Sequence, residues 1–234
     1  MRPIRLLSAM VCLLWAAASP AAAGQSAAAR VTFLRPQAYS AAVVQGPWKL
    51  LRLGDPVSPG TVLKTDTQGL LELTLPDGSV IRLGPDTQYR IESAAFAGKK
   101  RSGFSARLFF GRMWAKVSRL TTSAKGAFDV SIPTAVVGVR GTTYNIDANA
   151  DKSAEISVFE GRVGVAPPLV EAGGSKEQIS WPAQVSEQQW EEIILAKLQK
   201  LRIGRDGKPG KPQPIDLAKV DEWVRWNRER DSQL

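Results

Sequence analysis

The feature that most constrains the fold is a succession of short segments with strand patterning between residues 31 and 167. Leu71, Leu73 and Leu75 alternate with other residues, so in a strand their side chains share one face. An Asp-Gly dipeptide at residues 77–78 follows, and it tolerates the positive φ of a tight hairpin turn. Strands at intervals of roughly 8–12 residues with turns between them are typical of a β-sandwich, barrel or roll.

A weak internal repeat adds detail to this all-β prediction. An aromatic residue, any residue, glycine, arginine and an apolar residue occur in this order around Gly111 and again around Gly161. Glycine inside a strand pattern often marks a bulge or a close approach of the backbone. We therefore predict that the two glycines are equivalent corners of a compact β roll or β-helix-like sandwich, rather than parts of a closed barrel.

The first residues predict export. Arg2 and Arg5 precede an apolar run at residues 6–18, and small residues end at Ala23. A basic start, a short apolar segment and an A-x-A site describe a signal peptide over residues 1–23, and hence a periplasmic location. An uncleaved anchor is the alternative. No later apolar stretch reaches the roughly 20 residues that a transmembrane helix needs, so we expect no transmembrane segment in the mature chain.

The residue types that are scarce argue against catalysis. The chain contains no histidine, and its one cysteine, Cys12, lies inside the predicted signal peptide. Serine–histidine and cysteine–histidine nucleophile systems are therefore excluded, as are the usual transition-metal sites. Of the remaining carboxylates, Asp77 and Asp86 lie in predicted turns, where aspartate is favoured for local hydrogen bonding, and nothing in the sequence distinguishes a catalytic acid among them. We expect a protein that is not an enzyme and that has no cofactor or metal.

The charge balance is basic, with a formal net charge of +9. Such an excess attracts nucleic acid, anionic lipid or acidic glycans. Export makes nucleic acid a poor partner, and a basic surface that serves only solubility is the alternative to a dedicated anion site.

The chain changes character after residue 167. We expect a linker at residues 168–185 and a helical C-terminal extension at residues 186–234. Ser186 with Gln189 resembles a capping box, and apolar residues at helical spacing predict a helix over residues 187–201. Residues 202–214 are rich in proline and glycine and are predicted to be a linker. A second helix is expected over residues 216–230, docked on the β domain or on a partner through its tryptophans.

The most distinctive motif lies at residues 133–142, where Gly138 and Gly141 flank Arg140. It lacks the Gly-Lys-Ser/Thr ending of a phosphate-binding loop and does not lie in a βαβ unit. We interpret it as a tight crossover between strands, in which glycine adopts backbone conformations closed to other residues. Arg140 is then predicted to fasten the loop by bonding carbonyl groups or a carboxylate.

This motif resembles the signature of the FecR domain. The segments at residues 51–55, 73–79 and 158–163 fit the same family in the same order, and residues 223–227 resemble a segment that accompanies exported standalone members. The resemblance implies an all-β extracytoplasmic domain. In the founding type, a periplasmic sensor domain passes a signal from an outer-membrane receptor to a cytoplasmic sigma factor. Here a predicted signal peptide replaces the cytoplasmic segment and membrane span, so we expect the binding role without the relay.

The expected function is thus that of a non-enzymatic protein-binding, scaffold or signalling module of the cell envelope. The alternative is a carbohydrate- or peptidoglycan-binding module, because an exposed tryptophan can stack on a sugar ring; the expected partner is therefore an envelope protein or a cell-wall glycan. The candidate binding residues are Arg140, Thr142, Trp223 and Trp226. The residues expected to carry structural motifs are Pro133, Gly138, Gly141, Asp77, Gly78, Gly111 and Gly161.

Overall fold

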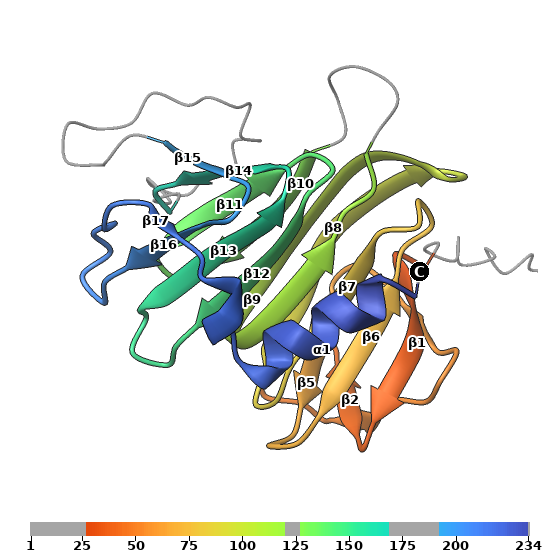
Figure 1. The fold of residues 1–234 in the computed structure, drawn as a ribbon. Coiled ribbons are helices and arrows are strands. Elements are labelled where there is room, and N and C mark those ends of the chain that lie inside the picture. Colours follow the sequence, from red (N-terminus) through yellow and green to blue (C-terminus); the bar gives the residue numbers. More distant parts are fainter. Residues whose placement is uncertain (1–26, 120–126, 169–191, 234) are drawn as a thin grey trace, which may run out of the picture.

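The structure, a computed structural model, describes residues 27–119, 127–168 and 192–233. The predicted signal peptide and nearly all of the predicted linker at 168–185 lie outside these residues. The described residues form strands and one C-terminal helix, as Figure 1 shows. The prediction of an all-β fold with a short helical extension is confirmed. Over the same residues, no helix is long and apolar enough to cross a bilayer.

The strands form two hydrogen-bonded layers. The first, sheet A, runs in spatial order through β4 (Pro56–Val57), β1 (Ala29–Arg35), β6 (Leu70–Thr74), β7 (Val80–Leu83), the end of β9 (Lys100–Lys116), β12 (Thr143–Ala148), β13 (Ala154–Glu160), β16 (Gln199–Ile203) and β17 (Gln213–Pro214). The second, sheet B, runs through β3 (Lys49–Leu50), β2 (Ala38–Ala41), β5 (Val62–Thr65), β8 (Gln88–Ala97), the start of β9, β10 (Ala127–Ile132), β11 (Ala135–Val139), β14 (Arg162–Ala166) and β15 (Ile193–Ala196).

Strand β9 belongs to both sheets and bends at Gly111. Residues 100–110 pair with β8, whereas residues 111–116 pair with β12. Gly111 has φ +103°, and a Cβ atom there would collide with Thr87. Only glycine fits this conformation and this close approach without strain. The glycine of the first repeat thus marks a corner of the fold, as predicted from the sequence.

The second glycine of the repeat also marks a crossing between the sheets. Gly161 has φ +80° and separates β13 in sheet A from β14 in sheet B. Gly141, with φ +59°, lies at a third corner, between β11 and β12. Hairpins therefore alternate between the two layers along the chain, which is the arrangement of a roll.

The core lies between the layers. The alternating leucines predicted to share a face, Leu71, Leu73 and Leu75, are at most 2% exposed and pack in one cluster with residues of sheet B such as Leu63 and Leu108. Fully burying a side chain of this size contributes about 1.5–3 kcal/mol, so this shared interior holds the two sheets together.

The helix predicted over residues 187–201 is wrong for the part that the structure describes. Residues 192–201 contain β15, a turn with Leu198 at φ 60°, and the start of β16. Leu195 opposes Val163 in sheet B, and Leu201 opposes Ile156 in sheet A. These apolar residues complete the edges of both sheets, and this long-range pairing outweighs their helical spacing. The predicted linker at 202–214 is an ordered turn followed by β17.

The last helix is confirmed. A 3₁₀ turn η1 (Leu217–Lys219) precedes α1 (Glu222–Asp231), whose N-cap Asp221 accepts a hydrogen bond from the Val224 amide at 3.0 Å. In Figure 1, α1 lies across the outer face of sheet A, on the side away from the core. A second apolar cluster fills this contact, with Trp114 and Phe159 from the sheet and Trp223 and Val224 from the helix.

Candidate functional site

The outer face of sheet A carries a row of side chains that α1 covers. Glu72, Arg82, Trp114 and Asn145 are register partners on β6, β7, β9 and β12. Their neighbours along each strand point into the core, so these four side chains point outwards, towards the helix. A charged residue inside a strand otherwise made of buried residues requires a partner, and here the partner is α1.

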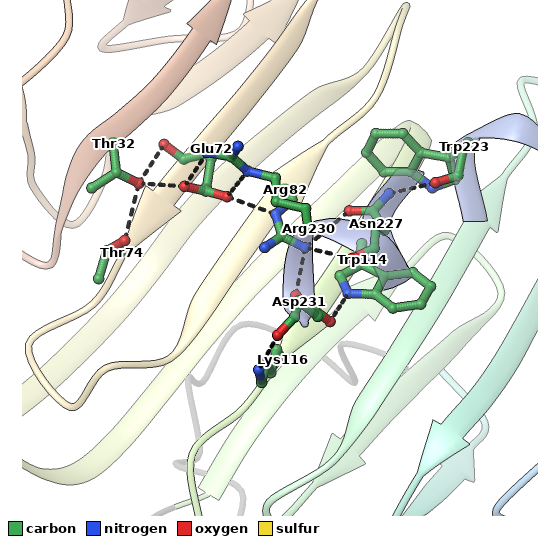
Figure 2. A network of polar contacts seen from close by, with 10 residues as sticks. All are labelled: Thr32, Glu72, Thr74, Arg82, Trp114, Lys116, Trp223, Asn227, Arg230 and Asp231. Atoms are coloured by element: carbon green, nitrogen blue, oxygen red, sulfur yellow. Dashed lines mark hydrogen bonds and ion pairs between the residues drawn. The ribbon is translucent and has the colours of Figure 1, made fainter. Parts of the chain in front are cut away.

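An ion network ties the helix to this row, as Figure 2 shows. Arg82 is fully buried and donates from Nε to Glu72 at 2.7 Å and from Nη1 to Asp231 at 2.6 Å. Arg230 donates from Nε to the same carboxylate of Glu72 at 2.6 Å. Burial alone would raise the pKa of Glu72, but the hydrogen bonds from Arg230 and Arg82 outweigh it, and the pKa is lowered. Glu72 is therefore ionised at neutral pH.

The two tail tryptophans belong to this internal contact. Trp223 is 8% exposed, and its indole nitrogen donates to the Asn145 side-chain oxygen at 2.8 Å. Trp226 is half-buried and packs against Phe33 with ring centroids 5.8 Å apart. Both were named as binding residues, and the structure places them against the chain's own β-sheet. A ring as buried as that of Trp223 cannot serve as a platform for a sugar.

Beyond the end of α1, the next row of the outer face is open. Thr74, Val80, Lys116, Thr143 and Glu160 are register partners on five adjacent strands. They line a groove of about 440 Å³, which we call the row groove; the loop residues that complete it are Gly78, Val117, Ser118, Arg119, Gly141 and Thr142. The Lys116 ammonium donates to the Asp231 carbonyl at 3.0 Å, so the helix end borders the groove.

The motif at residues 133–142 forms one wall of the row groove. Thr142 is 1% exposed, and its hydroxyl donates to the Arg162 carbonyl at 2.9 Å, which fastens the corner. The side chain of Arg119 lies where a Cβ atom of residue 141 would be. Arg140 is exposed and makes no side-chain hydrogen bond or ion pair with another described residue, so it does not fasten the loop as expected. Thr142 fastens it instead.

The Asp-Gly hairpin forms the opposite wall. Gly78 has φ +80°, and Asp77 accepts hydrogen bonds from the Ser79 amide at 3.0 Å and hydroxyl at 2.9 Å. Asp77 also pairs with the buried Arg101, which the local turn pattern could not reveal. Arg101 contacts the Ser118 carbonyl at 3.4 Å, so the hairpin and the groove floor are joined.

The other motif residues lie before the corner at Gly141, in a separate turn and in strand β11. Pro133 is exposed at the turn between β10 and β11, and Gly138 pairs with Gly164 across β11 and β14. Neither lines the row groove. The structure thus brings together Gly78, Gly141 and Thr142, and leaves Pro133 and Gly138 outside the group.

Sequence reasoning missed the groove residues that are free to bind. Arg119, Ser118, Thr143 and Glu160 make no side-chain hydrogen bond with any other described residue, whereas the network under α1 is internally paired. Arg119 and the two hydroxyl groups, together with Lys116 at the end of α1, form a set of donors suited to an anionic group. In the sequence, Thr143 and Glu160 lie two and one residues from the corner glycines Gly141 and Gly161, whereas no such pattern marks Ser118 or Arg119.

These observations define a two-layer β domain. The motif at residues 133–142 contributes Gly141 and Thr142 to the row groove at one end of this domain. The model of the family "FecR protein" matches residues 61–164, so this part of the chain is similar to a FecR domain. The match begins at β5 and ends within β14, and thus includes both walls of the row groove.

Solved structures share this fold. Two crystal structures, each described as a "putative anti-sigma factor" from Parabacteroides distasonis, match at 20% identity with TM-scores of 0.51 and 0.50. The match covers 70% of this chain in both cases, and 63% and 64% of those chains. The chain therefore spans less than two thirds of either neighbour. No curated protein matches the chain.

Proposed function

We propose that this chain is a non-enzymatic, extracytoplasmic FecR module that acts by binding a protein of the cell envelope. The FecR domain supports a signalling module, and the fold of anti-sigma-factor-like neighbours agrees with that class. The observation that carries the proposal is the contrast between two adjacent rows of sheet A. The row under α1 is paired within the chain, whereas the row groove contains Arg119, Ser118 and Thr143, whose side chains have no hydrogen-bond partner among the described residues.

This contrast supports binding over a purely structural role. Polar side chains without a hydrogen-bond partner in the chain do not stabilise the fold. They provide binding specificity when groups of a partner protein form hydrogen bonds or ion pairs with them. The buried position of Trp223 under the helix also favours a protein over a sugar ring, as does the lack of an aromatic side chain among the described residues that line the row groove.

The test compares two double variants of the exported chain in intact cells. Arg119→Gln with Arg140→Gln removes two exposed cations, one that lines the groove and one that precedes the lining residue Gly141. Lys208→Gln with Lys211→Gln removes two exposed cations from the turn before β17, which does not line the groove. After chemical crosslinking and affinity purification, mass spectrometry quantifies the captured envelope proteins. We expect one protein to be captured by the wild type and by the control, and to be lost from the groove variant. Equal capture by all three, or saturable salt-resistant binding to purified sacculi alone, would contradict the proposal.

A further inference from the structure

We infer that the row groove binds an acidic, extended peptide segment of the partner protein. This inference rests on the proposed function and adds the chemistry of the partner. It follows from three properties of the groove: its charge, its shape and the one carboxylate within it.

The charge around the groove is strongly positive. Arg101 joins the β8–β9 hairpin to the groove, and the exposed Lys99 and Lys100 lie beside it in sequence at the hairpin tip. On the opposite side, the exposed Arg119 lines the groove, and the exposed Arg140 precedes the lining residue Gly141. Arg101 is paired with Asp77, but the other four cations have no carboxylate of the described chain within ion-pair distance, so their field attracts an anionic ligand.

The shape of the groove fits an extended chain. Its floor is a row of five register partners, from Thr74 on β6 to Glu160 on β13. Adjacent strands lie about 4.8 Å apart, so the row spans about 19 Å, the length of about six residues of an extended peptide. Lys116 lies at its centre with the Thr143 side chain next to it, and Val80 supplies an apolar contact on the other side.

Glu160 decides between a peptide and a uniform polyanion. A carboxylate at the end of the row repels a ligand that is charged along its whole length, such as polyphosphate or an anionic glycan. A peptide can place its acidic side chains at Lys116 and Arg119 and a neutral or basic residue at Glu160. Arginine binds carboxylates through two parallel hydrogen bonds, which gives the position of Arg119 directional specificity.

The probe is a fluorescein-labelled peptide with three glutamates followed by three alanines, measured by fluorescence anisotropy in 150 mM NaCl because lower salt exaggerates surface attraction. The same peptide with glutamines is the neutral control. We expect saturable binding of the acidic peptide, weakened about tenfold by Arg119→Gln with Lys116→Gln. Lys208→Gln with Lys211→Gln should leave it within about twofold, since these cations are remote.

Arg119→Gln alone keeps the inference testable if the Lys116 variant fails to fold, because Arg119 is exposed and lacks a described polar partner. Glu160→Gln should enable hexaglutamate to bind more tightly, since it removes the one repulsive group. Equal weakening by the groove and control variants would overturn the inference, as would groove-dependent binding to phosphatidylglycerol vesicles or polyphosphate without binding to the peptide. If the envelope protein is still lost from the groove variant while the peptide fails to bind, the inference about acidic peptides falls and the proposed function stands.

Discussion

Replacing Glu72 by glutamine tests whether the ion network holds α1 on sheet A. The carboxylate accepts hydrogen bonds from Arg82 at 2.7 Å, from Arg230 at 2.6 Å and from the Thr32 hydroxyl at 3.0 Å. The side chains of Arg82 and Glu72 are 0% and 5% exposed. Breaking a buried pair by removing one partner costs about 3–5 kcal/mol. Because Arg82 keeps Asp231, we expect the lower end, a loss of about 3 kcal/mol in the free energy of unfolding.

Urea unfolding followed by tryptophan fluorescence measures this loss as a fall in the midpoint at an unchanged slope. Glu92→Gln is the matched control, because Glu92 also pairs with an arginine on a neighbouring strand, Arg107 at 3.1 Å, with side chains 36% and 52% exposed. An exposed pair of this kind contributes about 0–1 kcal/mol. If Glu72→Gln loses no more than Glu92→Gln, the network does not hold the helix and the reasoning is refuted.

Four further outcomes follow from the same structure. The lowered pKa of Glu72 means that its contribution is present above the ordinary value of 4.5 and is lost as the pH falls through the folded value, so Glu72→Gln should flatten the acid limb of stability against pH. Gly111→Ala should cost at least about 2 kcal/mol in urea unfolding, whereas Gly103→Ala on the same strand, with no atom near its added Cβ, should stay within about 0.5 kcal/mol. Tyr144→Phe should leave stability unchanged or raise it by up to about 1 kcal/mol, because it removes a buried hydroxyl without a hydrogen-bond partner among the described residues; a clear loss would show that the hydroxyl is paired. Trp223→Phe should cost about 1–3 kcal/mol, since it leaves a buried amide oxygen without its donor; an unchanged midpoint would argue against docking of the helix.

Local patterns predicted the layers and corners of the fold. The alternation of Leu71 and Leu73 requires a strand with one buried face, and both side chains are buried. The repeated glycine motif identified Gly111 and Gly161 as corners. Their positive φ values of 103° and 80° strongly favour glycine, so such corners can be recognised in the sequence. Such features are local, and a single sequence is sufficient to reveal them.

The features that the sequence did not predict depend on contacts between residues far apart in the chain. The apolar residues of β15 and β16 fit helical spacing as well as strand alternation, and only their pairing with β14 and β13 decides between the two. The pair of Glu72 with Arg230 joins residues 158 positions apart, so no local pattern contains it. A signal was nevertheless present in Arg82, a charge between Ile81 and Leu83 in a strand whose residues are all buried.

The row groove could be predicted least. Its floor combines residues from five strands, and its function depends on which polar groups the fold leaves unpaired. From the motif at residues 133–142 we predicted Arg140 and Thr142 as binding residues, and part of this motif forms one wall of the row groove. The structure gives Thr142 a structural role and adds Arg119 and Lys116 as the cations that face the groove.

Site-specific photo-crosslinking in living cells tests the central claim most directly. A photoreactive phenylalanine derivative is placed at residue 140, next to the groove-lining Gly141, or at residue 107, an exposed arginine on sheet B. We expect one discrete crosslinked envelope protein from position 140 and none from position 107. The same protein crosslinked from both positions, or crosslinks from position 140 that disappear when the cell wall is digested, would contradict a protein-binding role for this groove.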